Sequence, residues 1–542
     1  MRNSTFCLLA LAILLIGIGH MAFLPPFEGF DEIAHYSSIR QIADTHTIPI
    51  YGRSYLGNDI IDYQLHGPMH YAITPPYNEN GGMIYPYFFK EPGLTQTYEK
   101  MYREPTQRKQ FTPSTEENWQ AQHPPLYYLI MAPLMKASDF LPFVTQLFVL
   151  RFVSFLMAFA GLMIGLWGSL KYTAPSMRSS IATGYLLYPL IVPMFYSEFG
   201  RLGNDGLCLF LMGVIWVLLL HHFNNEREWK PALALGVVFG IGLLTKAFFM
   251  VILAGFAPYL LLRLWRGRRD KKISRIRLRN LLLIFAPIFL ASGWYVYKAI
   301  TYGTLTGGRD FILLTKQGGL IANLQKRFTL MQFFFGIATT FASWSWFGTQ
   351  SLTKIPELIQ LPMLVMLLWF IMGYLIRAQR QKLTEPIWLP AWLIVPFLFG
   401  LLYHLITIIA LVGTGNHTPG WYLSILSPAL GVAFAYALEV FDENRRAQYL
   451  LYGLWLYGIA FIVVANWFQV AMYAGCAIKG ADKNYQFQDH HYCLSQIPTI
   501  ASHISVLGWP MLGAVGFGGG VLCLVVGLVK TIRARPRVNI WA

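Results

Sequence analysis

The sequence predicts an all-α polytopic membrane protein with about twelve transmembrane helices and a large first extracytoplasmic loop that carries juxtamembrane helices. Of its 542 residues, 55% are hydrophobic and only 13% are charged, whereas soluble domains carry about 25% charged residues. The apolar residues form repeated runs near the length of about 20 that crosses a bilayer. Lys and Arg lie mainly at the ends of these runs, so the net charge of +16 indicates membrane orientation rather than nucleic-acid binding.

The first apolar run, residues 6–24, is predicted to be a retained helix. It reads FCLLALAILLIGIGHMAFL, which is longer than the apolar core of a signal peptide and lacks a small-residue cleavage site. The chain that follows it is therefore expected to emerge on the outer face.

One basic loop fixes the orientation of the remaining spans. Residues 263–279 hold nine Lys or Arg and one acid, which is typical of a cytoplasmic loop. Counting outward from it places both termini inside and predicts spans at 6–24, 147–169, 180–199, 206–222, 232–246, 247–265, 281–300, 356–377, 386–411, 421–441, 447–468 and 507–530.

The outer face then consists of three long segments and two turns of a single membrane domain, residues 1–542. The long segments are the first loop at 25–146, a second at 301–355 and a third at 470–505, and the turns lie near 200–205 and 412–420. Two further apolar stretches begin at residues 123 and 328. Counting either one as a span would break the alternation of inside and outside segments that the basic loop fixes. We expect both to lie along or dip into the outer interface, although a full span is left open for the second.

The five cysteines fall into two groups. Cys7, Cys208 and Cys523 lie within apolar runs and are interpreted as packing residues. Cys476 and Cys493 share the third outer segment, on the oxidising side, where a disulfide would form; the alternative is two free thiols.

Acidic residues gather directly after the first helix, in PPFEGFDEIAHY at residues 25–36. Asp31 and Glu32 are adjacent, and one of them could act as a general base. The alternative is that they only favour a helix N-terminus. His35 follows three residues later and is a candidate substrate contact.

Several polar groups are expected at the same outer face. His123 precedes a Pro-Pro pair, Lys246 interrupts an apolar stretch that suits two short spans, and Arg151 begins the second long helix. These cations would suit a lipid phosphate; the alternatives are interfacial anchors and ion pairs between helices. The outer turns add Arg201 as a further candidate for the phosphate, and Asn204, Asp205, His417, Trp421 and Tyr422 as candidate substrate contacts.

The order of these motifs resembles the GT-C superfamily of membrane glycosyltransferases. The shared pieces are one helix, an Asp-Glu pair in a large outer loop, PPLYY, an Arg-led helix, an ND turn, GLLTK and finally GWYLSILSP, over about residues 1–430. The sequence looks closest to the branch of the lipid A aminoarabinose transferases and protein O-mannosyltransferases. No P-loop, GxGxxG, HExxH or GxSxG motif stands in a usable context.

The resemblance implies transfer of a sugar from a polyprenyl phosphate to a lipid, glycan or protein acceptor, usually with inversion, on the outer side of a bacterial inner membrane. It implies Asp31 as the base or acceptor-orienting carboxylate, with Glu32 beside it. It implies no cofactor; a divalent cation on oxygens of Asp31, Glu32 and Asp205 is left open. Two departures concern the ligand contacts: His123 and Trp421 stand where relatives carry Lys and Arg.

Two other classes remain as alternatives. A transporter or flippase for a lipid-linked or anionic substrate would also hold charges in the membrane, but it would show inverted repeats, and none is visible. A non-catalytic membrane subunit that kept the fold is the second alternative, since fold alone does not establish activity.

Overall fold

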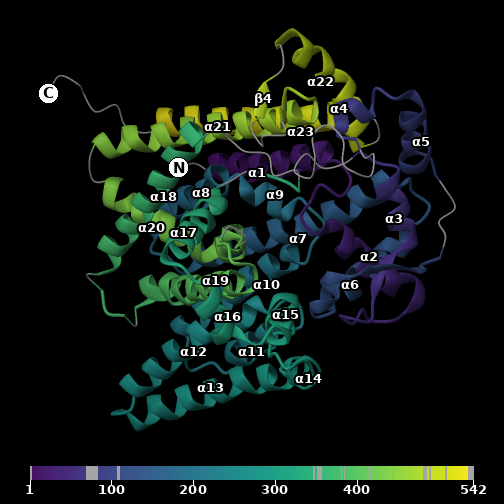
Figure 1. Ribbon diagram of the computed structural model, residues 1–542. Helices are drawn as coiled ribbons and strands as arrows, with labels where there is room; N and C mark the ends of the chain where they lie inside the picture. The colour runs from purple at the N-terminus through teal and green to yellow at the C-terminus, as the bar shows by residue number, and fades with distance from the viewer. Residues whose placement is uncertain are drawn as a thin grey trace.

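The structure is a computed structural model that describes most of the chain (Figure 1). The described residues are 3–68, 83–105, 110–345, 348–350, 357–379, 381–383, 385–415, 418–442, 445–479, 485–487, 490–506 and 510–534. Helices dominate throughout, and two small two-stranded antiparallel sheets complete the secondary structure in these ranges. The predicted all-α polytopic class is therefore confirmed.

Nine helical stretches among the described residues are long and apolar enough to cross a membrane, so this is a multi-pass membrane protein. They are α1 (Asn3–Phe23), α7 (Phe143–Tyr172), α10 (Asp205–Asn224), α12 (Phe248–Arg266), α18 (Glu357–Ala378), η3 with α19 (Pro386–Trp388 and Leu389–Val412), η4 with α20 (Gly420–Leu426 and Ser427–Asp442), α21 (Arg445–Tyr473) and α23 (Pro510–Ala534). A tenth is the pair α13 (Lys271–Ala291) and α14 (Gly293–Tyr302), bent by 42°.

The two other predicted spans form shorter helices. The predicted span at 180–199 is divided between α8 (Arg178–Ile191), which follows the short η2 (Pro175–Met177), and α9 (Met194–Phe199), since Pro193 has no amide hydrogen to continue α8. Residues 232–246 give α11 (Lys230–Leu243), which is 14 residues long. The prediction of twelve full-length spans thus overstates the length of these two.

Small residues let the long helices approach closely. Helix α23 packs antiparallel on α1, because Gly513 lies against Phe23 and Gly520 against Ile16. Added Cβ atoms would lie only 2.3 Å and 2.6 Å from those side chains, which is the close backbone approach typical of membrane helices. Helix α1 therefore begins, and α23 ends, at the same end of the bundle.

The opposite end carries the first loop, shown on the right of Figure 1. The first loop forms α2 (Glu32–Thr45), β1 (Tyr55–Gly57), α3 (Asn58–Leu65), α4 (Tyr85–Phe88), α5 (Pro92–Arg103), β2 (Pro113–Glu117), η1 (Trp119–Gln122) and α6 (Leu126–Ala137). Strands β1 and β2 pair antiparallel, with Tyr55 opposite Glu117. The stretch from residue 123 is thus the short helix α6, as expected for a segment that does not span.

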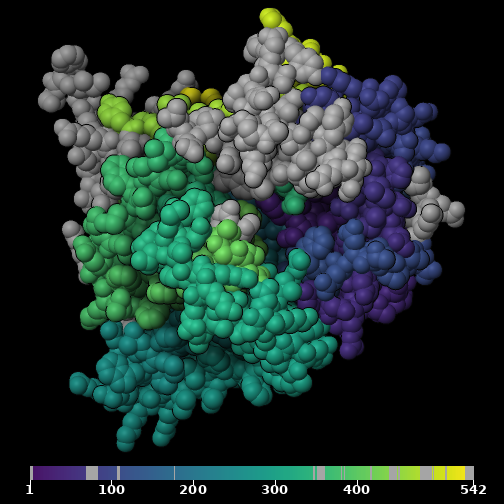
Figure 2. Space-filling view, viewed as in Figure 1, coloured from purple at the N-terminus to yellow at the C-terminus, as the bar shows by residue number. Residues whose placement is uncertain are grey.

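The second outer segment packs against the first. It forms α15 (Arg309–Lys316), α16 (Leu320–Arg327) and α17 (Leu330–Ser345), and in the view of Figure 2 its teal side chains lie against the blue first loop. The Tyr302 hydroxyl donates to the Tyr51 carbonyl at 2.9 Å, and Ile312 packs against Tyr51 and Ala121. These contacts fix the end of α14 relative to the first loop.

The third outer segment carries β3 (Ala477–Lys479), β4 (Tyr485–Phe487) and α22 (His490–Ile504). A disulfide joins Cys476 and Cys493, the two cysteines of the predicted bridge. The side chain of Arg103 in α5 donates to the carbonyl of Ser502 at 2.6 Å, so this segment is fastened to the first loop.

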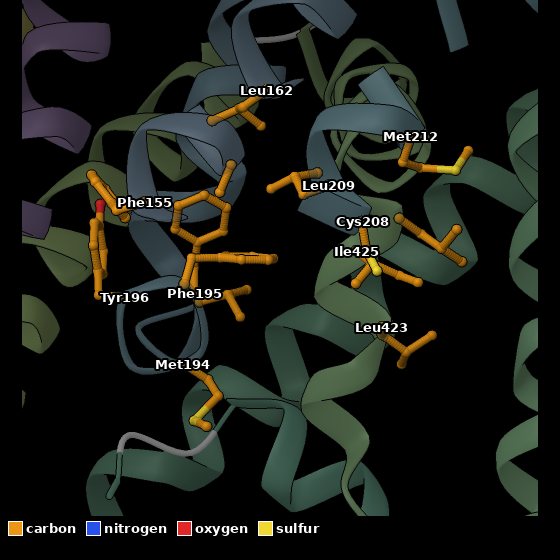
Figure 3. Packing of buried hydrophobic residues seen from close by; sticks show 14 of the residues in the cluster. Phe155, Leu162, Met194, Phe195, Tyr196, Cys208, Leu209, Met212, Leu423 and Ile425 are labelled. Atoms are coloured by element: carbon orange, nitrogen blue, oxygen red, sulfur yellow. The ribbon is translucent and has the colours of Figure 1, made fainter. Parts of the chain in front are cut away.

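The central core lies where α7, α9, α10 and η4 meet (Figure 3). Phe155 of α7, Phe195 of α9, Leu209 of α10 and Ile425 of η4 belong to one buried cluster. Because α9 and the start of α10 flank the turn at residues 200–204, this packing holds the polar turn in place beside the first loop.

Candidate active site

Asp31 occupies a special backbone position between α1 and α2. It precedes the first residue of α2 with φ 58° and ψ 7°, the left-handed region, and its side chain does not cap the helix. Its Oδ1 atom accepts a 2.8 Å hydrogen bond from Trp119 Nε1. Among the described residues it forms no ion pair, and its second oxygen has no hydrogen-bond partner. This carboxylate is therefore oriented but not neutralised.

Glu32, the neighbouring acid, is fully engaged with Arg151 of α7. Arg151 Nε lies 2.6 Å from Glu32 Oε1, and Arg151 Nη2 donates to Glu32 Oε2. The amide of Leu202 also donates to Oε1 at 2.9 Å. Arg151 further donates to the carbonyls of Leu24 and Pro25 at 2.6 and 2.8 Å. This buried pair joins the end of α1, the start of α2, α7 and the turn at 200–204.

A second charged network surrounds Asp205, the first residue of α10. Arg201 donates to Asp205 at 2.9 Å and to Glu198 of α9 at 2.8 Å. Lys246 lies in the break between α11 and α12, as its sequence context predicts, and donates to the other oxygen of Asp205 at 2.7 Å. Arg201 also donates to the Phe30 carbonyl at 2.8 Å, which brings the network next to Asp31.

The charges of these two networks balance. The carboxylates of Glu32, Glu198 and Asp205 are matched by Arg151, Arg201 and Lys246. Glu198 is a member that sequence reasoning missed, although its position three residues before Arg201, at the end of α9, was an available signal. Asp31 stands outside this balance.

Two histidines form the next part of the site. The rings of His35 and His123 are parallel within 3° with centroids 6.3 Å apart, and His35 Nδ1 lies 3.0 Å from the Tyr128 hydroxyl. Burial, followed by the nearby Arg201, lowers the pKa of His35 well below its usual value. Burial, followed by Lys246, lowers the pKa of His123 to about 3. Both rings are therefore neutral at physiological pH.

Aromatic rings and one amide complete the predicted set. Trp421 stacks on Phe30 at 5.0 Å and 17°, and Tyr422 lies 5.0 Å from the Lys246 ammonium. The Asn204 amide is buried, and its carbonyl oxygen has no hydrogen-bond partner among the described residues. His417 falls outside the described residues. The structure thus brings the other predicted contacts into one outer site.

The suggested cation ligands are not gathered around a common point. The oxygens of Glu32 are taken by Arg151 and Leu202, and those of Asp205 by Arg201 and Lys246. Within the described ranges, no three His, Cys, Asp or Glu side chains are grouped as a metal site would require. The donor set in its present arrangement does not fit a divalent cation.

Comparison with protein families gives one match. The family model described as "Predicted membrane protein (DUF2142)" matches residues 14–384. Among curated proteins, no sequence matches this chain.

Comparison with solved structures gives similarity at low sequence identity. The chain is similar to ArnT from Cupriavidus metallidurans bound to undecaprenyl phosphate, with 12% identity and a TM-score of 0.47, over 98% of this chain and 79% of that one. It is also similar to the Archaeoglobus fulgidus oligosaccharyltransferase in complex with Zn and sulfate, with 12% identity and a TM-score of 0.35, over 84% of this chain and 52% of that one. The chain thus spans about half the length of the oligosaccharyltransferase. Both are GT-C members.

Proposed function

This chain belongs to the membrane-protein family described as DUF2142, and we propose that it is a glycosyltransferase that uses a polyprenyl-phosphate sugar donor. The sugar goes to an acceptor hydroxyl at the outer face of the membrane, with inversion. The observation that carries the proposal is Asp31, a carboxylate that forms no ion pair among the described residues and lies beside the two paired networks. The order of sequence motifs supports the same reaction class.

In the proposed reaction Asp31 is the base. The free Oδ2 atom accepts the proton of the acceptor hydroxyl while Trp119 holds Oδ1. The hydroxyl oxygen forms a bond to the anomeric carbon, the bond from that carbon to the phosphate oxygen breaks, and polyprenyl phosphate leaves with the electron pair. One base suffices for a single displacement with inversion, whereas double displacement needs a second close carboxylate as nucleophile.

Glu32 acts as a positioning residue in this proposal. Both of its oxygens are bound to Arg151, so it is unavailable as a base but holds the backbone next to Asp31. Lys246, Arg201 and His123 line the side toward which negative charge develops on the leaving phosphate, where oriented donors stabilise that charge. His35, Asn204, Trp421 and Tyr422 form the remaining wall.

The location follows from the predicted topology. The site lies at the end of the bundle that is opposite the beginning of α1 and the end of α23. The basic loop at 263–279 assigns the end with the site to the outside of the membrane. In a bacterial inner membrane this is the periplasmic side, where no ATP is present. A lipid-linked donor supplies the needed activation without a nucleotide.

The test is a transfer assay with the purified protein in nanodiscs. A panel of radiolabelled polyprenyl-phosphate sugars is added with candidate acceptors, and release of free polyprenyl phosphate is followed. Asp31→Asn is compared with Asp62→Asn, an exposed acid in the same outer loop. We expect release by the parent and by Asp62→Asn only. Full release by Asp31→Asn would refute the assignment, and movement of the donor between leaflets without release would favour a transporter.

A further inference from the structure

Lys298 of α14 is a buried cation that has no carboxylate partner among the described residues. Its side chain is 1% exposed. The contacts of its ammonium are with two aromatic rings, Trp294 at 5.1 Å and Tyr302 at 4.7 Å. Within the described part of the chain, no acid lies within the 4.0 Å of an ion pair. It differs in this from the three cations of the charged networks.

The surroundings of Lys298 place it at the edge of the outer site. Gly307 has φ +62°, and a Cβ added to it would lie 2.5 Å from Lys298 Cδ, so the loop after α14 covers the lysine stem. That loop leads to Arg309, whose amide donates to the Gln122 side chain at 2.6 Å. Gln122 directly precedes His123, and the charge of Lys298 contributes to lowering the pKa of His123. Lys298 and His123 therefore belong to one neighbourhood.

An uncompensated buried ammonium is costly to the fold. Removal from water penalises the charge, and two aromatic faces repay only part of that penalty. A lysine that merely reaches for the interface would expose its ammonium to water, and Lys298 does not. An anionic ligand in the functional state would supply the missing counter-charge.

The outward side of α14 suits a ligand that arrives from the membrane. Val296 and Ile300 are 52% and 81% exposed on this helix, while Lys298 points into the protein. An acyl or prenyl chain can lie against such an apolar surface while its polar head reaches inward. Lys246 and Arg201 already form ion pairs with Asp205 and Glu198, whereas Lys298 forms none among the described residues.

We infer that Lys298 is the cation that binds the phosphate of the polyprenyl-phosphate donor. This inference rests on the proposed function and deepens it by assigning the residue that supplies the net positive charge. An ammonium binds phosphate as a point charge without the fixed geometry of a guanidinium. The same residue retains the phosphate of the product, since polyprenyl phosphate carries an additional negative charge after the sugar leaves.

The test measures binding of undecaprenyl phosphate to the full-length protein in phosphatidylcholine nanodiscs. Lys298→Met is compared with the wild type and with Lys316→Met, an exposed lysine on the neighbouring helix α15. We expect Lys298→Met to weaken binding at least tenfold, Lys316→Met to have no effect, and Lys298→Arg to retain most of the affinity. The uncharged undecaprenol is expected to bind all four proteins alike.

Thermal unfolding of the unliganded proteins separates this role from a structural one. Lys298→Met is expected to unfold at the same temperature as the wild type or at a higher one, because the variant lacks the costly buried charge. If methionine disturbs folding, Lys298→Gln is the second variant. A Lys298 variant could instead unfold at a lower temperature than the wild type and lose as much affinity for undecaprenol as for undecaprenyl phosphate. That result would overturn the inference in favour of a structural role.

The remaining outcomes distinguish the inference from the proposed function. If the wild type binds undecaprenyl phosphate and Lys298→Met binds it equally well, the inference fails while the proposed function stands. If the wild type does not bind it, both fail. Dioleoyl phosphatidic acid could bind the wild type as tightly as undecaprenyl phosphate does, and lose the same affinity in Lys298→Met. The site would then accept phospholipid head groups, and the donor assignment would be overturned.

Discussion

The ammonium of Lys246 lies 2.7 Å from one oxygen of Asp205, and Arg201 lies 2.9 Å from the other. This carboxylate joins the break between α11 and α12 to the turn before α10. A lysine that stands alone in an apolar stretch of the sequence is thus already paired. Its replacement affects both stability and ligand binding, and an experiment on it has to separate the two.

Lys246→Ala is expected to weaken donor binding, but less than Lys298→Met, because the charge of Lys246 is balanced by Asp205. It also leaves Asp205 with one cation, so the loss of stability should stay below the about 3–5 kcal/mol of a fully broken buried pair. Lys246→Met/Asp205→Asn should regain the stability but not the donor affinity. Undecaprenyl phosphate binding and unfolding are measured on each variant; unchanged affinity in a folded Lys246→Ala would count against a phosphate contact.

Asp31→Asn is expected to reduce transfer by about 10²–10⁴-fold, the usual contribution of a general base. Folding should be preserved, since Asn tolerates the left-handed backbone at φ 58° and its side-chain oxygen can still accept from Trp119. Trp119→Phe, which removes the orienting hydrogen bond, should give a smaller loss of transfer. Equal activity of Asp31→Asn and the parent would exclude Asp31 as the base.

Arg151→Met is expected to destabilise the protein by about 3–5 kcal/mol, because it leaves the buried Glu32 carboxylate without its cation. The double variant Arg151→Met/Glu32→Gln should recover much of this loss. Denaturant unfolding in detergent gives the comparison. A double variant as unstable as Arg151→Met alone would show that the contacts of Arg151 with the carbonyls of Leu24 and Pro25, rather than the ion pair, dominate.

Acid is expected to destabilise the outer site through His35 and His123. The folded state lowers the pKa of both rings, to about 3 for His123, from an ordinary value of 6.5. Below about pH 6.5 the unfolded chain binds protons that the folded chain refuses, so stability falls as the pH drops from 6.5 toward 3, at about 1 kcal/mol per pH unit for each ring. The unfolding temperature should decline in that window.

A matched pair of variants checks this assignment. His123→Gln should reduce the acid sensitivity, whereas His66→Gln, at an exposed position of the same outer loop, should leave it unchanged. Identical pH profiles for His123→Gln and the parent would contradict a role for His123.

The disulfide is expected to stabilise the third outer segment. Cys476 and Cys493 are 17 residues apart, and a loop of this size predicts a contribution of about 3 kcal/mol in the chain-entropy account. Cys476→Ser/Cys493→Ser should lower the unfolding temperature, and dithiothreitol should lower that of the parent but not of the double variant. A parent that is insensitive to reductant would show that the bridge adds nothing to global stability.

The sequence alone was sufficient to predict much of this protein. Hydropathy and the basic loop predicted the helical membrane class and most of its spans, because the length of an apolar run is a local property that the bilayer fixes. The pairing of Cys476 with Cys493 followed from their sharing one outer segment. Lys246 was correctly placed in a helix break because one cation interrupts two apolar runs.

Only the tertiary structure decided how the charges are used. Glu32 with Arg151, and Asp205 with Arg201 and Lys246, became neutral partners once α2, α7, α10 and the break before α12 packed together. Lys298 showed the same sequence signal as Lys246, a single cation in an apolar run, yet it has no acid within ion-pair distance among the described residues. Composition and spacing report which charges a helix carries. Which of them meet depends on the contacts between helices distant in sequence, and among the described residues Asp31 and Lys298 are left without an ion pair.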